Sequence, residues 1–234
     1  MLQIGGIQKT TLIDYPGRVA ATIFLCGCNF RCPFCYSSEL VLQKKIILQP
    51  KISEKELFGF LKKRKRLLEG VVICGGEPTI NKELPDFVKK IKDFGFLVKL
   101  DTNGSNPGML KKLIDLKMID YVAMDIKAPF GKKYKQATGA KINLNDIKKS
   151  VGIIKGSGID YEFRSTIVPG IHTKEDIIQI AKDIGPARKF FLQNFRPEKT
   201  INSDLEAVRP YPKDFLLEVK KVIKGFFEIC EVRY

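Results

Sequence analysis

The stretch Val19-Ala-Ala-Thr-Ile-Phe-Leu25 is followed almost at once by Cys28-Asn-Phe-Arg-Cys32-Pro-Phe-Cys35. The first segment is mostly β-branched or apolar, which predicts a buried strand. The second places three cysteines at C-x3-C-x2-C spacing in the loop after that strand. Four cysteine ligands close an iron–sulfur cluster, whereas three leave one iron free to bind another molecule. The spacing therefore predicts a cluster site with an open iron at the end of the first strand.

The rest of the chain alternates short β-branched or aromatic runs with longer, lysine-dotted amphipathic segments. Ser53-Glu-Lys-Glu56 has the spacing of a helix N-terminus with a capping box. Six strand–helix alternations predict a parallel sheet with helical crossovers, in a single domain over residues 1–234. The expected strands are Val19–Leu25, Gly70–Cys74, Phe96–Leu100, Tyr121–Ile126, Tyr161–Val168 and Phe190–Phe195. The expected helices lie near Ser53–Leu68, Leu84–Phe94, Pro107–Leu116, Leu144–Lys155, Lys174–Ile184 and Lys213–Lys224.

Unusual polar clusters gather at one end of these strands. In parallel sheets the loops at the carboxyl ends of the strands converge, and the chemistry collects there. The cysteine loop follows the first strand, and the other clusters end or follow later ones, so we expect a single site at this edge. These clusters are Gly75-Gly-Glu-Pro78, Asp101-Thr-Asn-Gly104, Asp125-Ile-Lys127, Arg164 with Val168-Pro-Gly170, and Gln193-Asn-Phe-Arg-Pro197.

A zinc knuckle, or a structural cluster with a fourth protein ligand, is the alternative for the cysteine loop. Cys26, Cys74 or Cys230 could supply that ligand, although Cys26 fits better as a small buried residue at the end of a strand. His172 is the only histidine, which argues against mixed Cys/His zinc sites. We expect His172 to be a loop residue on the rim of the site.

The composition is that of a soluble globular protein, with 44% hydrophobic and 29% charged residues. No apolar run reaches the roughly 20 residues needed to cross a bilayer, and the start does not resemble a secretory signal. Three cysteines crowded into eight residues favour metal binding in a reducing compartment. We therefore expect a cytoplasmic protein without a membrane partner.

The net charge of +15 has two interpretations. It could reflect an acidic partner or nucleic acid, or a solvated, lysine-rich surface. The densest basic cluster, Lys62-Lys-Arg-Lys-Arg66, has no interleaved aromatic residues for stacking on single-stranded nucleic acid. We favour the solvated surface and do not expect nucleic-acid binding.

Together these motifs resemble the radical S-adenosylmethionine (SAM) superfamily. The cysteine loop, with Phe34 as the aromatic before the last cysteine, is similar to the signature of that superfamily, and Gly75-Gly-Glu-Pro78 is similar to its motif after the second strand. Asp101-Thr-Asn-Gly104 and Asp125-Ile-Lys127 narrow the resemblance to the glycyl-radical-enzyme activases. The stretch from Asp14 to Tyr36 looks most like the anaerobic ribonucleoside-triphosphate reductase activating proteins. The resemblance covers about residues 14 to 197, which leaves a C-terminal helix and tail over 198–234.

The resemblance implies two cofactors and their ligands. Cys28, Cys32 and Cys35 would hold a [4Fe-4S] cluster whose fourth iron binds the amino and carboxylate groups of SAM. Gly75 and Gly76 would let the methionine part approach the backbone, and Glu77 or a neighbouring carbonyl would accept from its ammonium. The alternative for Glu77 is a helix-entry residue. The remaining expected SAM-binding residues are Phe34, Tyr36, Thr102, Asn103, Asp125, Lys127, Arg164, Asn194 and Arg196.

Several of these roles keep an alternative. Phe34 and Tyr36 would flank the adenine, or else fill the barrel core. Some activases similar to this chain place a monovalent cation beside the SAM carboxylate, and Asp101, Thr102 and Asp125 offer oxygen ligands for one. A plain Asn-Gly turn is the alternative there, and we favour it.

The implied fold is an α/β, incomplete (β/α)6 barrel with parallel strands. The implied activity is reductive cleavage of SAM to a 5′-deoxyadenosyl radical, which takes a hydrogen from a glycine of a partner glycyl radical enzyme such as anaerobic ribonucleotide reductase. An electron donor such as flavodoxin or ferredoxin would be a second partner. One alternative is a radical SAM enzyme that acts on a nucleotide or tRNA base. The other is a non-catalytic iron–sulfur electron carrier or a zinc-stabilised binding module.

Overall fold

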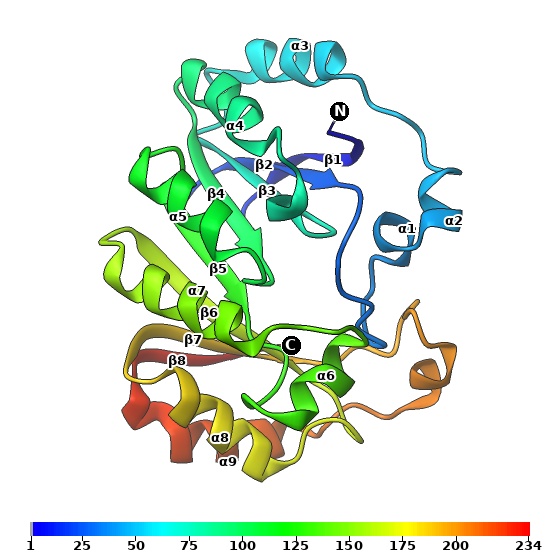
Figure 1. Cartoon of the computed structure of the whole chain (residues 1–234), viewed down its shortest axis with the longest axis vertical. Coiled ribbons are helices and arrows are strands. Elements are labelled where there is room, and N and C mark those ends of the chain that lie inside the picture. The colour runs from blue at the N-terminus through cyan, green and yellow to red at the C-terminus, as the bar shows by residue number, and fades with distance from the viewer. Residues whose placement is uncertain (1) are drawn as a thin grey trace.

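The computed structural model describes residues 2–234, which form an eight-stranded sheet in the order β1 to β8 (Figure 1). Six of its strands, β2 to β7, are parallel to one another, and helices connect each of them to the next. All six were predicted, and their boundaries agree within three residues. They are β2 (Ala20–Leu25), β3 (Gly70–Gly75), β4 (Leu97–Thr102), β5 (Tyr121–Asp125), β6 (Asp160–Ile167) and β7 (Ala187–Asn194).

Two edge strands were not predicted. β1 (Ile4–Thr11) pairs antiparallel with β2, and β8 (Phe227–Arg233) pairs parallel with β7. The sequence of β1 gives only a weak strand signal, because it contains Gly5-Gly6 and ends in Gln-Lys-Thr-Thr. Within the described residues β1 and β8 do not pair with each other. The incomplete barrel is therefore confirmed, with one strand added at each edge and an open side between β1 and β8.

The six predicted helices are also present, and α3 begins after Ser53, with the Ser53 half of the expected capping box. Ser53 caps it by accepting from the Glu56 backbone N–H at 3.1 Å. These helices follow the outer side of the sheet (Figure 1). They are α3 (Glu54–Arg64), α4 (Leu84–Asp93), α5 (Pro107–Asp115), α7 (Leu144–Gly156), α8 (Lys174–Ile184) and α9 (Lys213–Ile223).

Shorter helices that were not predicted lie mainly beside the cysteine loop or at element ends. α1, α2 and α6 lie on the side of the carboxyl ends of the strands (Figure 1). One to two turns of helix give almost no periodic signal in a sequence. These elements are α1 (Ser38–Val41), α2 (Gln43–Ile46), α6 (Lys132–Thr138) and the 3₁₀ turns η1 (Pro78–Ile80), η2 (Ser203–Ala207) and η3 (Lys224–Phe226).

The two faces of the sheet differ in chemistry, as β4 illustrates. Val98 and Leu100 are buried in the main apolar cluster, whereas Lys99 and Asp101 pair with each other on the alternate face. Asp101 also forms an ion pair with Arg164 of β6, two strands away. The apolar core therefore lies between the sheet and the outer helices, and the inside of the barrel is polar. No helix within residues 2–234 combines the length and apolarity required to span a membrane.

Candidate functional site

One pocket of about 510 Å³ opens at the carboxyl ends of the strands. All the residues expected to bind a cluster or SAM line it, although they come from six strands or the loops after them. This convergence follows from the parallel register, which brings the strand ends to one edge. They are Cys28, Cys32, Phe34, Cys35, Tyr36, Gly75, Gly76, Glu77, Asp101, Thr102, Asn103, Asp125, Lys127, Arg164, Asn194 and Arg196.

The three cysteines are shielded thiols on one side of this pocket. The backbone N–H of Phe30 donates to Cys28 Sγ at 3.3 Å. Burial raises the pKa of Cys28 to about 12 and that of Cys32 to about 11. Such thiols lose their protons when they bind a metal. Within the described chain no group of three His, Cys, Asp or Glu side chains is arranged around one metal ion. A multi-iron cluster differs from such a centre, because each of its cysteines binds a separate iron.

Gly75 and Gly76 bring β3 against the start of the cysteine loop. Gly75 has φ of +121°, in a region that L side chains avoid. A Cβ on Gly76 would overlap the carbonyl oxygen of Gly27. The backbone N–H of Glu77 donates to that same oxygen at 2.7 Å. Both glycines therefore fix the loop close to the second parallel strand and leave the backbone open to the pocket.

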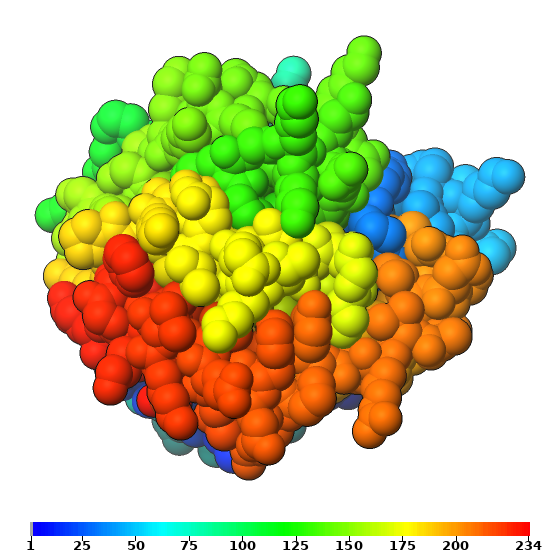
Figure 2. Space-filling model, turned by 90° about the horizontal axis from the view of Figure 1, so that it is seen from below, coloured from blue at the N-terminus to red at the C-terminus, as the bar shows by residue number. Residues whose placement is uncertain are grey.

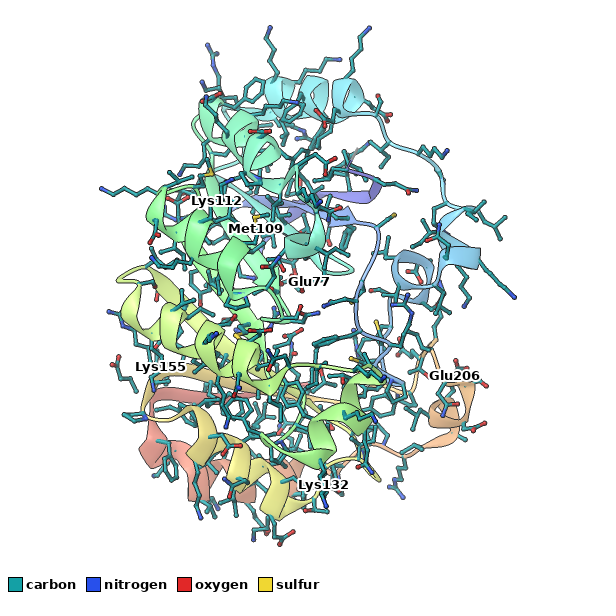
Figure 3. All side chains as sticks on the ribbon, viewed as in Figure 1. Glu77, Met109, Lys112, Lys132, Lys155 and Glu206 are labelled. Atoms are coloured by element: carbon teal, nitrogen blue, oxygen red, sulfur yellow. The ribbon has the colours of Figure 1, made fainter. Side chains whose placement is uncertain are left out.

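Glu77 is a buried carboxylate, only 1% exposed, that lies on the inner side of the barrel wall (Figure 3). It accepts from the Thr79 N–H at 3.1 Å and from the Thr102 hydroxyl at 2.7 Å. The Asn103 N–H donates to its other oxygen at 2.6 Å. No lysine or arginine of the described chain forms an ion pair with it. Burial raises the pKa of Glu77, although the hydrogen bonds from these donors act to lower it. When ionised, Glu77 is the negative pole of the pocket, and it has no cationic partner among the described residues.

A chain of buried ion pairs supplies the opposite pole. Arg164 donates from Nε to Asp125 at 2.9 Å and from a terminal nitrogen to Asp101 at 3.0 Å. Lys127 Nζ binds Asp125 at 2.9 Å, and Lys99 binds Asp101. Arg164 also lies 3.9 Å from Glu162, which pairs with Arg233 at 2.9 Å, so four cations share three carboxylates. The excess positive charge lies in a shielded place, where it favours an anionic ligand.

The pKa values in this chain follow from its ion pairs. Burial opposes ionisation of Asp125, but Arg164 and Lys127 outweigh it and hold the pKa of Asp125 below its usual range. Burial likewise opposes the charge on Lys127, but Asp125 and the nearby Cys32 raise its pKa above its usual range. Because Asp101 and Asp125 already have protein cations as partners, we do not propose a monovalent cation site there.

One hydrogen-bond acceptor in the pocket lining, Asn194 Oδ1, has no donor among the described residues. Asn194 Nδ2 donates to the Tyr211 carbonyl at 2.9 Å. Among the described residues its Oδ1 is one of two buried side-chain oxygens with no hydrogen-bond partner. Leaving a buried acceptor unpaired is costly, so a donor from a ligand would be favourable there.

The aromatic and cationic residues near Asn194 support one another. Tyr36 stacks on Phe195 with ring centroids 6.2 Å apart, and its hydroxyl accepts from the Arg196 N–H at 2.7 Å. The Arg196 guanidinium lies 5.5 Å from the centre of the Tyr36 ring. Phe34 is buried in the main core while it lines the pocket. The cysteine loop and the end of β7 are thus joined across the open barrel.

His172 was expected on the rim of the site, and this prediction is wrong. The residue is 1% exposed. Its Nδ1 accepts from the Val168 N–H at 3.1 Å, so Nε2 carries the proton and donates to the Lys127 carbonyl at 2.8 Å. Burial lowers its pKa. His172 therefore fixes the backbone of Lys127, which the sequence could not indicate because the two residues meet only through the fold.

The sequence interpretation missed part of the pocket lining. Arg233 and Tyr234 at the end of β8 line it, as do Ile13 and Asp14 after β1. Arg233 donates to both oxygens of Glu162 at 2.9 and 3.0 Å. The alternation in Phe-Glu-Ile-Cys-Glu-Val-Arg, which ends at Arg233, was a usable strand signal.

The chain matches known proteins over most of its length. The family model of the radical SAM superfamily matches residues 22–184. A Methanocaldococcus jannaschii protein named "Putative glycyl-radical enzyme activating enzyme" is 34% identical, over 98% of this chain and 95% of that protein. A GTP 3′,8-cyclase of Aliarcobacter butzleri is 29% identical, over 76% of this chain and 57% of that protein.

A solved structure supports the fold. The crystal structure of Streptococcus suis SuiB bound to S-adenosylmethionine matches with a TM-score of 0.66 at 15% identity, over 87% of this chain and 48% of that one. The family model spans more than half of the chain, and its residues include the cysteine loop and the strand-end motifs as far as Val168-Pro-Gly170. This chain belongs to the radical SAM superfamily.

Proposed function

We propose that the protein activates a glycyl radical enzyme. Membership of the radical SAM superfamily implies a [4Fe-4S] cluster and SAM. The observation that carries the proposal is the pocket itself, which joins three cysteines, a negative pole and a positive pole and is continuous with the open side of the barrel. The name of the 34% identical relative supports the same activity.

The residues fit the two cofactors in chemistry. Cys28, Cys32 and Cys35 would hold the cluster, as thiolates that iron keeps deprotonated. SAM carries an ammonium and a carboxylate, and Glu77 and Lys127 offer the matching opposite charges. When bound, the cluster and SAM would supply reductive cleavage of the sulfonium and hence a 5′-deoxyadenosyl radical.

The other pocket residues would bind and shield SAM. Asn194 Oδ1 lacks a donor, so it would accept from the adenosyl group. Thr102 and Asn103 would act by holding Glu77, since each donates to its carboxylate. Arg164 would hold Asp125 and Asp101 in place, and would keep Asp125 ionised, rather than contact SAM itself. Tyr36, Phe34 and Arg196 would limit the entry of water.

The open side of the barrel supports a protein substrate. Ile13 and Asp14 on one edge, and Arg233 and Tyr234 on the other, line the same pocket as the cysteines. A backbone loop of a partner could enter there and bring a glycine Cα close to the 5′-carbon of SAM. We propose a cytoplasmic setting, because such cysteines require a reducing compartment.

A glycyl radical assay tests the proposal. The reconstituted protein would be mixed anaerobically with SAM, a reductant and a glycyl radical enzyme from the same organism, such as its anaerobic ribonucleotide reductase. Electron paramagnetic resonance should detect a glycyl radical in the partner, and oxygen should then cleave the partner at one backbone position. The likeness to a GTP 3′,8-cyclase supports the alternative of a nucleotide substrate. Turnover of GTP or a tRNA base, with no glycyl radical in any such partner, would favour that alternative.

A further inference from the structure

Part of the cysteine loop faces solvent. Asn29 and Arg31 are exposed there. The loop is seated on α6, because the Arg31 N–H donates to the Thr138 carbonyl at 2.8 Å. Gly139 packs so closely that a Cβ would overlap the Arg31 carbonyl oxygen. The surface of α6 therefore continues directly from the loop that carries the cysteines.

This surface is basic and largely unpaired. Residues 131–141 contain four lysines and no acidic residue. Lys133 binds Asp176 at 2.5 Å. Within residues 2–234 no carboxylate forms an ion pair with the remaining exposed cations, which we call the α6 basic surface: Arg31, Lys132, Lys135 and Lys141. Figure 2 shows long side chains projecting from the green α6 region beside the blue cysteine-loop region, and Figure 3 shows Lys132 at the outer edge of the molecule.

One residue of the α6 basic surface, Arg31, belongs to the cysteine loop itself. Arg31 is bracketed by Cys28 and Cys32, and its guanidinium donates to the Cys28 carbonyl at 2.6 Å and to the Phe30 carbonyl at 2.7 Å. A protein docked on α6 would therefore sit directly over the loop. The residues that would admit a substrate, Ile13 and Tyr234, belong to the open side between β1 and β8 instead.

Other surfaces fit an acidic partner less well. The segment 195–209 also borders the loop, but its charges balance: Arg196, Lys199 and Arg209 against Glu198, Asp204 and Glu206. Glu39, outside this segment, also lies 3.9 Å from Lys199. The lysine cluster on α3 is dense, but α3 lies on the outer side of the sheet, away from the cysteine loop (Figure 1). Charge and proximity to the loop coincide on α6.

We propose that the α6 basic surface docks an acidic electron-carrier protein that reduces the cluster. One electron would pass from the reduced flavin or iron–sulfur centre of the donor to the cluster, and the donor would leave oxidised by one electron. Complementary charge speeds such encounters and weakens with salt. This inference rests on the cluster of the proposed function, but not on the identity of the substrate.

A pair of matched double variants tests the inference. Lys132→Glu/Lys135→Glu reverses two exposed charges three residues apart on α6. Lys62→Glu/Lys65→Glu makes the same change in net charge, at the same spacing, at the C-terminal end of α3. Both are made in the reconstituted enzyme, with iron content matched to the parent. Stopped-flow absorbance then follows cluster reduction by a reduced acidic flavodoxin at low salt, and by photoreduced 5-deazariboflavin, a small neutral reductant.

We expect flavodoxin to reduce the cluster of the α6 variant about tenfold more slowly than that of the parent. The rate for the α3 variant should be close to that of the parent. The small reductant should reduce all three proteins at the same rate. Salt should slow the parent and leave the α6 variant almost unchanged. Equal rates in all three proteins, or equal slowing by both variants, would overturn the inference. The inference would also be overturned if the α6 variant lost binding to tRNA while flavodoxin reduced its cluster at the parent rate. Normal cluster reduction without a glycyl radical in any partner would instead refute only the proposed function.

Discussion

Replacing Arg164 by Gln tests whether the ion pairs inside the barrel hold the site together. Arg164 is the link between the two carboxylates, with contacts of 2.9 Å to Asp125 and 3.0 Å to Asp101. Its side chain is 14% exposed, so solvent replaces little of what the guanidinium provides. Gln has similar reach but carries no charge. The variant therefore leaves two shielded carboxylates with one cation fewer.

The expected loss follows from what remains. Removing one partner from a buried ion pair costs about 3–5 kcal/mol. Asp101 keeps Lys99 and Asp125 keeps Lys127, so we expect the lower end, about 3 kcal/mol. In a domain of this size that corresponds to a fall in Tm of about 6–12 °C.

The assay is anaerobic urea denaturation of parent and variant, followed by circular dichroism. Lys89→Gln is the control, since it removes one partner of an exposed pair whose side chains are 65% and 60% exposed. Such pairs contribute about 0–0.5 kcal/mol. A loss in Arg164→Gln no larger than that of the control would refute the reasoning.

The same variant has a pH signature. The folded-state pKa of Asp125 lies below its unfolded value. Its stabilising contribution is therefore complete above the unfolded pKa, about 3.9, and is lost as pH falls toward the folded pKa. Without Arg164 the pKa of Asp125 should rise. The stability difference between parent and variant should thus shrink below about pH 4, and a constant difference would contradict this explanation.

Three further predictions concern the glycine turn, the negative pole and His172. Gly76→Ala should displace the cysteine loop and reduce the iron content of the cluster. Gly152 is its control, because it lies in a helix where a Cβ would meet open space. Gly152→Ala should raise the free energy of unfolding in urea by about 0.5–1 kcal/mol. Glu77→Gln should weaken SAM binding by at least about tenfold in equilibrium dialysis at unchanged iron content, and unaltered affinity would contradict the negative pole. Burial lowers the folded pKa of His172, so its contribution is complete above about pH 6.5 and is lost as pH falls toward that lower value. The stability advantage of the parent over His172→Gln should therefore fall from pH 7.5 to 5, by up to about 1.4 kcal/mol per pH unit, and a flat profile would refute the assignment.

The place of the site was predictable from the sequence, because the rule for parallel sheets needs only the order of strands and the residues after them. Cys28, Glu77 and Asn194 are far apart in the chain, yet each follows or ends a strand-like run, and all line one pocket. The six central strands carried enough β-branched residues to be recognised individually. The parallel sheet was predictable for the same reason, whereas its curvature into an incomplete barrel was implied by the resemblance to the radical SAM superfamily.

The partners of the charged residues were not predictable. Whether Arg164 meets SAM or Asp101 and Asp125 depends on the register of β4, β5 and β6, which no local pattern encodes. β8 carried a strand signal that the sequence interpretation overlooked, but the pairing of its last residue, Arg233, with Glu162 was not predictable. Contacts made across strands decide both cases, and they appear only in the folded chain.

Cluster content and SAM cleavage in single cysteine variants test the central claim most directly. After anaerobic reconstitution the parent should hold the cluster and release 5′-deoxyadenosine from SAM. Cys32→Ala should lose most of its iron and all cleavage, as should the Cys28 and Cys35 variants. Cys74→Ala is the matched control, because Cys74 lines the same pocket and should be dispensable. Loss of iron and cleavage in Cys74→Ala equal to that in Cys32→Ala would contradict a cluster held by three cysteines with one iron open to SAM.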